Sequence, residues 1–365
     1  MPSTDLADFA PRLVHWQKRH GRTTLPWQHT RDPYRVWLSE VMLQQTQVST
    51  VLAYYPRFLQ RFPTVQVLAE ASQDDVLGLW SGLGYYSRAR NLHRCAQAVV
   101  GLHGGQFPVS AQGLQTLPGI GRSTAAAIAA FCHGERVAIL DGNVKRVLTR
   151  LLGFDGDLAQ ARNEALLWGH ASKLLPSAAL LKAQPAAMAH YTQGLMDLGA
   201  SLCSRKNPQC TLCPASGLCQ AQRSGTWHDF PVKTRKLKRT AQVMWLLLAR
   251  SAAGDVWLHK RPSAANGQGI WAGLYAPPVF ASRTELAATL PRRLQTRLQD
   301  GSALVHALTH KDLHLHPVWL NLPMPSVLAE AGQVQDGQWL AAAQWPALGL
   351  PAPVRQLLVS GPNGV

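Results

Sequence analysis

The stretch LPGIGRSTAAAIAAFC, residues 117–132, places two glycines directly before an alanine-rich segment of helical character. Glycine lets a backbone approach a phosphate closely. The start of a helix offers free N–H groups and the positive end of the helix dipole. Gly119, Gly121 and the helix from Arg122 to Cys132 therefore predict an element that grips a DNA backbone without reading its sequence. Taken alone, the pattern also fits an ordinary turn.

Asp141 lies where the next helix should begin, after the apolar run from Val137 to Leu140 and before Gly142-Asn143. One interpretation is an N-cap aspartate, worth about 1 kcal/mol. The other is a carboxylate held facing a cleft. Both can hold together, because a cap fixes the backbone beneath the side chain.

Four of the six cysteines crowd into residues 203–219 with the spacing C-x6-C-x2-C-x5-C, namely Cys203, Cys210, Cys213 and Cys219. Crowding of this kind in a cytosolic chain favours metal ligation over disulfides. Four thiolates can hold a zinc ion or a [4Fe–4S] cluster, although structural zinc usually pairs two C-x2-C knuckles and only one is present. Arg205 and Lys206 lie between the first two cysteines, where a pinned loop could present them to a phosphate.

The chain has 365 residues and a formal net charge of +16, with a sequence pI of about 10.1. A chain of this length favours two domains. The positive charge favours a polyanionic partner, because neutralised phosphates release counterions. No segment reaches the ~20 apolar residues of a membrane span, and the N-terminus lacks an apolar signal core. We expect a cytoplasmic protein, nucleoid-associated if bacterial, and a monomer.

The pattern divides the chain into three parts. Residues 1–228 favour helices, with Asp32-Pro33 as cap and first position of one helix and a capping box at Ser72 and Asp75. Residues 229–240 form a basic linker that is either a solvated segment or a tracker of phosphates; its basic residues are Lys233, Arg235, Lys236, Lys238 and Arg239. Residues 241–361 predict a smaller α/β domain, with a hairpin turning at Gly254-Asp255.

Together these stretches resemble the helix–hairpin–helix DNA glycosylase superfamily and, more narrowly, the MutY-type adenine DNA glycosylases. The likeness also rests on WLSEVMLQQTQ at 37–47, GLGYY at 82–86 and LDGNV at 140–144. It is dense over residues ~10–225 and looser beyond ~240. The resemblance implies a helical catalytic domain with the helix–hairpin–helix at about 111–132, one [4Fe–4S] cluster and a Nudix-like C-terminal domain.

The family's activity is hydrolysis of the N-glycosidic bond of adenine mispaired with 8-oxoguanine or guanine. Resemblance assigns Glu40 as the acid that protonates the departing base at N7, because burial in its apolar helix would keep it protonated. Asp141 would lie beneath the developing oxocarbenium ion, with Asn143 and Ser123 in support. The resemblance also implies contacts to the DNA backbone and base stack from Gln45, Tyr85, Gly119, Gly121, Arg205 and Lys206. It implies an adenine pocket lined by Arg22, Leu25, Trp27 and Gln193. Contacts to 8-oxoguanine are expected from Leu308, Thr309 and His310.

Several positions depart from related patterns. Endonuclease III carries a lysine nucleophile where this chain has Ser123, which disfavours a bifunctional glycosylase/lyase. Leu308 stands where Phe is common in the lesion loop, so the strength of 8-oxoguanine discrimination is in doubt. The Nudix metal-binding signature is absent, so pyrophosphatase activity is not expected. A noncatalytic DNA-scanning protein remains the alternative of another class, opposed by Glu40 together with Asp141.

Overall fold

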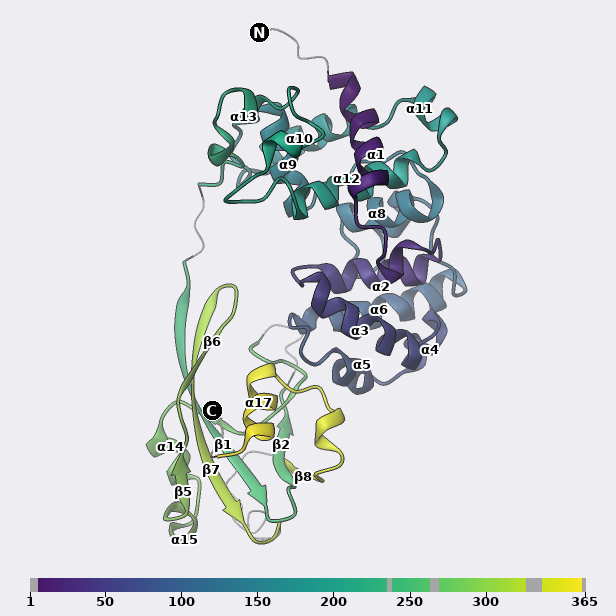
Figure 1. Cartoon of the computed structure of the whole chain (residues 1–365). Helices are drawn as coiled ribbons and strands as arrows, with labels where there is room; N and C mark the ends of the chain where they lie inside the picture. The colour runs from purple at the N-terminus through teal and green to yellow at the C-terminus, as the bar shows by residue number, and fades with distance from the viewer. Residues whose placement is uncertain (1–5, 235–237, 263–268, 326–336, 363–365) are drawn as a thin grey trace. The chain divides into compact units, whose positions relative to one another are not determined.

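In the computed structural model, described for residues 6–234, 238–262, 269–325 and 337–362, the backbone packs into two units (Figure 1). The first comprises residues 1–69 and 94–236, and the second comprises residues 70–93 and 237–365. Arg235 and Lys236 of the predicted linker lie outside the described residues. Among the described residues, no helix is both long and apolar enough to cross a membrane.

The first unit is helical, as its patterns predict. Its elements are η1 Leu6–Asp8, α1 Phe9–His20, η2 Pro26–Gln28, α2 Pro33–Leu43, α3 Val48–Arg61, α4 Val65–Glu70, the second half of α6 Tyr86–His103, α7 Ala111–Leu114, α8 Arg122–His133, α9 Gly142–Leu152, α10 Ala161–Lys173, α11 Ala178–Ala183, α12 Ala187–Ala200, η3 Cys210–Leu212, α13 Gln220–Arg223 and η4 Trp227–Asp229. The boundaries follow cap chemistry: the Asp32 side chain accepts a hydrogen bond from Tyr34 N at the start of α2, confirming that cap.

The core of this unit lies between α1, α8, α9 and α12, where Leu13, Ala127, Leu148 and Tyr191 are buried. Close approach of α12 to α9 depends on Gly199, since a Cβ there would meet Asn143 Cβ at 2.7 Å. The packing therefore fixes the start of α9, which carries Asp141.

The second unit is built on a mixed sheet. Its strands are β1 Thr240–Ser251, β2 Val256–Lys260, β3 Tyr275–Ala276, β4 Val279–Phe280, β5 Leu298–Asp300, β6 Leu304–Ala307, β7 Lys311–Leu322 and β8 Gln338–Leu340. Strands follow the order β3-β2-β1-β7-β5, while β4 pairs with β1, β6 with β7 and β8 with β2. The predicted hairpin is confirmed, with Arg250 opposite Val256 around the turn. β1 and β7 run parallel along their whole length.

Helices cover both faces of this sheet, which explains the unbroken apolar run in β1. Met244, Leu246 and Leu248 pack with α17 Ala352–Ser360, whereas Leu247 and Ala249 pack with α14 Arg283–Ala288 and α15 Arg292–Gln295 (Figure 1). The unit also contains η5 Trp345–Ala347, α5 Gln73–Trp80 and the first half of α6. The Ser72 hydroxyl caps α5 by accepting from Asp75 N, as predicted.

Candidate active site

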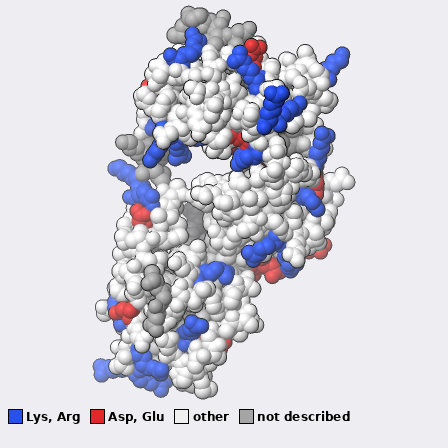
Figure 2. Space-filling view, in the orientation of Figure 1, with Lys and Arg blue, Asp and Glu red and all other residues white. Residues whose placement is uncertain are grey.

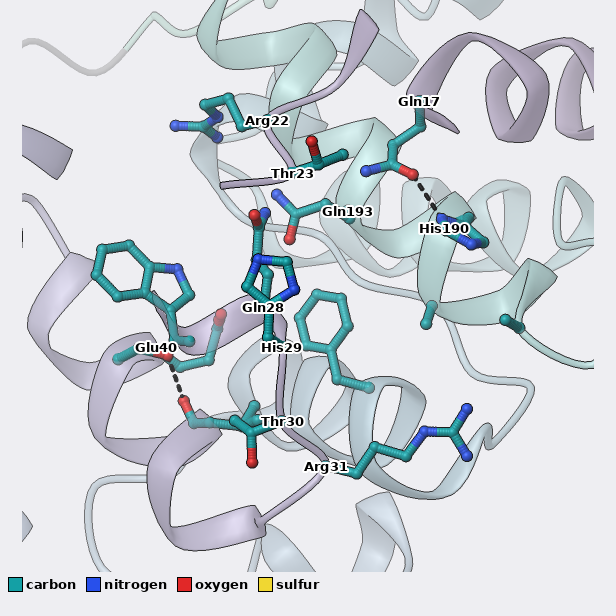
Figure 3. Close-up of a pocket in the computed structure, with 16 residues that line it drawn as sticks. Gln17, Arg22, Thr23, Gln28, His29, Thr30, Arg31, Glu40, His190 and Gln193 are labelled. Carbon is teal, nitrogen blue, oxygen red and sulfur yellow. Dashed lines mark hydrogen bonds between the residues drawn. The ribbon is translucent and has the colours of Figure 1, made fainter. Parts of the chain in front are cut away.

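A cavity of about 290 Å³ opens in the first unit between the segment after α1 and helices α2, α8 and α12 (Figure 3). This volume is near the lower end of the roughly 300–1,000 Å³ of small-molecule sites, which suits a single nucleobase. Arg22, Trp27 and Gln193, three of the four residues predicted to line a purine pocket, line it together with Glu40. Leu25, the fourth, is buried just before η2 and does not line this cavity.

Glu40 projects into this cavity from the last turn of α2 (Figure 3). Its neighbours Trp37, Leu38 and Val41 are buried, and Glu40 itself is partly buried where it lines the cavity. Burial raises the pKa of Glu40 to about 8, and the negative charge of Asp141 adds to the rise. A carboxyl group with this pKa keeps its proton at neutral pH and can donate it.

Asp141 caps α9, as one of the two interpretations of the sequence predicts. Its Oδ1 accepts hydrogen bonds from Asn143 N and Val144 N, both at 2.8 Å. The side chain is only partly exposed, and its charge acts on Glu40. The cap thus holds an acceptor-only carboxylate at a fixed place close enough to couple electrostatically with a protonated one.

Ser123 and Asn143 hold the segment that carries Asp141. Ser123 Oγ accepts from Leu140 N at 3.0 Å, directly before the aspartate. Asn143 Oδ1 accepts from Arg146 Nη2 at 3.0 Å, and Arg146 also donates to the carbonyls of Gly199 and Cys203. In this arrangement both side chains support the position of Asp141.

Asp197, which the sequence analysis missed, lies behind the cavity wall and holds two of the residues that line it. Its carboxylate is 2% exposed and pairs with Arg22, whose Nε lies 2.7 Å from Oδ1. Arg22 N donates to Oδ2, and Gln193 Nε2 donates to Oδ1. The available signal was an aspartate within the apolar run Leu195 to Leu198, four residues after Gln193 and so on the same helix face.

The hairpin exposes its two glycines while Ile120 between them is buried. Gly119 has a φ of 76°, a conformation that favours glycine, and Gly121 is the N-cap of α8. Arg122, another residue not singled out from sequence, begins α8 with its guanidinium 3.9 Å from the ring centre of Trp168. The hairpin therefore exposes the backbone of Gly119 and Gly121, with the charged side chain of Arg122 next to them in sequence.

We expect Gly119→Ala to destabilise the protein by about 1–2 kcal/mol, because alanine in a left-handed conformation is strained. Gly121→Ala is the matched control: its φ is −81°, and a Cβ there meets nothing within 4 Å. Both methyl groups should weaken duplex binding in fluorescence anisotropy, whereas only Gly119→Ala should lower the melting temperature. Equal melting temperatures, or unchanged binding by both variants, would contradict this role for the hairpin.

Gln45 and Tyr85, the residues expected to enter the base stack, both have left-handed backbones, with φ values of 56° and 48°. Gln45 is exposed in the first unit, and Tyr85, in the second, is 45% exposed. Such conformations are costly for residues other than glycine and cluster at functional positions. The Gln45 side chain is thereby exposed, whereas the Tyr85 side chain also contacts Arg88 and Thr309 of its own unit.

The four clustered cysteines line one small cavity of about 30 Å³. Burial raises the pKa of the Cys213 thiol to about 12, so a bound metal must displace its proton. Buried Arg150 donates to Cys203 Sγ at 3.4 Å and to the carbonyls of Ser204 and Arg205. The hydrogen bonds from Arg150 thus hold the loop backbone in place, while the side chains of Arg205 and Lys206 are exposed. In the part of the chain that the structure describes, no group of three or more His, Cys, Asp or Glu can hold a single metal ion.

In the second unit, residues 308–310 form the turn between β6 and β7. Leu308 packs against the core, whereas Thr309 and His310 are exposed. Thr309 Oγ1 lies 2.8 Å from the Tyr85 hydroxyl oxygen, a hydrogen bond in which either can donate. Tyr85, expected to enter the base stack, and Thr309, expected to contact 8-oxoguanine, therefore lie side by side. On the face shown in Figure 2, basic side chains cover more surface than acidic ones.

The chain is similar to known proteins over both units. A model described as "HhH-GPD superfamily base excision DNA repair protein" matches residues 38–170, and a NUDIX domain model matches residues 244–360. An adenine DNA glycosylase of Buchnera aphidicola subsp. Acyrthosiphon pisum is 34% identical over 353 residues, covering 96% of each chain. The human adenine DNA glycosylase is 41% identical over 228 residues, 60% of this chain and 40% of that protein. A solved structure of a thermostable thymine-DNA glycosylase is 26% identical with a TM-score of 0.54, covering 61% of this chain and 100% of that chain.

Proposed function

Because this chain belongs to the adenine DNA glycosylase family, we propose that it hydrolyses the N-glycosidic bond of adenine mispaired with 8-oxoguanine or guanine in duplex DNA. The observation that carries the proposal is Glu40, a carboxyl group with a pKa near 8 inside a base-sized cavity. Asp141, the negative charge coupled to it, supplies the second group that glycosidic hydrolysis requires.

In the proposed mechanism the adenosine leaves the base stack and its base enters the cavity. Glu40 donates its proton to N7 as the C1′–N9 bond breaks, so the bonding electrons leave with a neutral adenine. The ionised Asp141 stabilises the positive charge that develops on the sugar. A water molecule then bonds to C1′ and returns a proton to Glu40, which leaves an abasic site and a regenerated enzyme.

Hydrolysis without strand cleavage follows from the nature of Ser123. A lyase needs an amine to attack C1′. This position instead has a hydroxyl group, whose oxygen accepts a hydrogen bond from Leu140 N. We therefore propose a monofunctional enzyme.

Recognition of 8-oxoguanine is proposed for the second unit. The paired hydroxyls of Thr309 and Tyr85 support it, since both can exchange their mutual hydrogen bond for one to a base edge. Leu308 packs against the core and, as leucine, offers no aromatic face for stacking on a base, so hydroxyl contacts carry more of the discrimination here. The division of labour between residues 1–228 and 241–361 remains a prediction.

A [4Fe–4S] cluster is proposed for Cys203, Cys210, Cys213 and Cys219. The donor set fits, because four thiols line one cavity. Four thiolates are the ligand set that such a cluster takes. When bound, the group supplies a rigid scaffold, and Arg205 and Lys206 make the contacts to phosphate.

We expect Cys213→Ser to lose most of its iron and its visible absorbance, since the remaining thiols cannot complete the four-cysteine set. Duplex affinity should fall and depend less steeply on salt, because the loop bearing Arg205 and Lys206 loses its anchor. Cys132→Ser, outside this set, is the control and should keep its iron. Full iron content in Cys213→Ser would remove that residue from the ligand set.

The function is tested by incubating the protein with A:8-oxoguanine, A:G, A:T and oxidised-pyrimidine duplexes and separating base release from strand nicking. We expect adenine release from the first two, little from A:T, and nicking only after alkali. Intact mispaired adenine after treatment with the iron-loaded protein would end the proposal, and so would borohydride trapping of a protein–DNA adduct.

A further inference from the structure

Asp197 determines which end of the Gln193 side-chain amide faces the cavity. Its Oδ1 accepts from Gln193 Nε2 at 2.9 Å and from Arg22 Nε at 2.7 Å, while Oδ2 accepts from Arg22 N at 3.0 Å. With 2% of the side chain exposed, the carboxylate is shielded from water by the two groups it holds. Removing one partner of such a buried network leaves the others unsatisfied.

The carboxylate has no hydrogen to donate, so the amide nitrogen of Gln193 must face it. The amide oxygen consequently points the other way, into the cavity (Figure 3). This orientation follows from the chemistry of the pair rather than from the similar shapes of the two ends of an amide. Asp197 therefore makes Gln193 a hydrogen-bond acceptor toward whatever occupies the cavity.

Gln28 supplies the complementary group from η2. Its Oε1 accepts from Leu25 N at 3.3 Å, which turns its Nε2 away from the backbone. That nitrogen is buried and has no hydrogen-bond partner among the described residues, and Gln28 lines the same cavity. A buried donor without a partner is costly, so its presence indicates a ligand atom that accepts.

We infer that Asp197 is a specificity-determining positioning residue, which orients Gln193 so that Gln193 and Gln28 together recognise the 6-amino edge of a purine and reject a 6-oxo edge. The inference rests on the proposed function. Adenine offers an amino donor beside a ring-nitrogen acceptor, which matches an acceptor beside a donor. Hypoxanthine and guanine offer the reverse, a carbonyl acceptor beside an N–H donor, and would leave both amides unpaired.

The test compares base release from duplexes carrying adenine, unsubstituted purine or hypoxanthine opposite 8-oxoguanine, under single-turnover conditions. For Asp197→Asn we expect adenine release to slow roughly 10-fold or more relative to unsubstituted purine, the effect of one unmade hydrogen bond. The hypoxanthine-to-adenine rate ratio should rise, because asparagine can donate and lets the Gln193 amide turn over. Taking ratios within each variant cancels the different leaving abilities of the bases.

Asp155→Asn makes the same chemical change at an exposed position and should leave every ratio as in the unmodified protein. Equal slowing of all three bases by Asp197→Asn would overturn the inference, since a purely structural role predicts it. If Asp197→Asn does not fold, Gln193→Met provides the test, because methionine keeps the length of the side chain. The rate of adenine release relative to that of purine must then decrease. If it does not, the inference fails.

The outcomes separate the inference from the function on which it rests. No adenine release by the unmodified protein defeats the proposed function, whatever the variants do. Normal release by the unmodified protein, with ratios unchanged in Asp197→Asn and Gln193→Met, defeats the inference alone. In the double variant, the effects of the two substitutions on the adenine-to-purine ratio should not multiply, because both act through one amide.

Discussion

The Glu40→Gln variant should release adenine roughly 10²–10⁴ times more slowly than the unmodified protein under single-turnover conditions, the usual contribution of a general acid. Glutamine keeps the shape of the side chain and its place at the end of α2 but has no proton of useful acidity. Base flipping and duplex binding should persist, so an electrophoretic shift with A:8-oxoguanine duplex should be close to normal. Near-normal base release would remove Glu40 from the mechanism.

Although Glu40→Gln should slow base release, it should make the folded protein more stable. Because the pKa of Glu40 is raised from 4.5 to about 8 in the folded protein, the folded state binds more protons than the unfolded state between these values. The contribution of Glu40 to the free energy of unfolding therefore falls as pH rises from about 4.5 to about 8. At neutral pH Glu40→Gln removes a penalty on the order of 1–3 kcal/mol and should raise the melting temperature. Glu70→Gln, at an exposed position, is the control and should change neither rate nor melting temperature.

The same pKa sets the pH dependence of the unmodified enzyme. The proton that leaves with adenine is present below a pH of about 8 and is lost above it. Single-turnover base release should therefore decline as pH rises through about 8, and Glu40→Gln should lack this decline. An unmodified enzyme whose rate is flat between pH 6 and 10 would contradict the assignment of Glu40 as the acid.

Local chemistry explains which features the sequence predicts well. Asp32-Pro33, Ser72 and the Gly254-Asp255 turn act on their nearest neighbours, so their structural effects are visible in short patterns. Asp141 belongs to the same class, because its cap bonds join residues two and three positions apart. The resemblance assigns Glu40 to catalysis and Gln193 to the adenine pocket, and in the structure both residues line one cavity.

Features made by distant residues escape this reasoning. Residues 70–93 pack with the second unit through contacts such as Ser81 Oγ to Leu350 O, Arg355 Nε to Ser81 Oγ and Lys260 Nζ to Asp74 Oδ1. Nothing near α5 in the chain signals partners more than 180 residues away. Asp197 escaped for a related reason: its importance comes from Arg22, 175 residues distant, and a single aspartate in an apolar helix has many explanations.

Asp141→Asn separates the two roles of Asp141, because asparagine caps a helix as well as aspartate does. Its side-chain oxygen can still accept from Asn143 N and Val144 N, so the melting temperature should stay nearly unchanged. The negative charge is lost, however, and base release should fall roughly 10²–10³-fold, the usual effect of removing one electrostatic stabiliser of a transition state. Asp141→Ala loses the cap as well and should in addition destabilise the protein by about 1 kcal/mol.

A second consequence follows from the coupling between the carboxyl groups. The charge of Asp141 helps to raise the pKa of Glu40, so Asp141→Asn should shift the alkaline decline of its residual activity to lower pH. If Asp141 were only a helix cap, no such shift would be expected, because burial alone would then raise the pKa of Glu40. The variant must therefore be slow, fully folded and displaced in its pH profile; normal base release by a folded Asp141→Asn protein would leave the aspartate as a cap and nothing more.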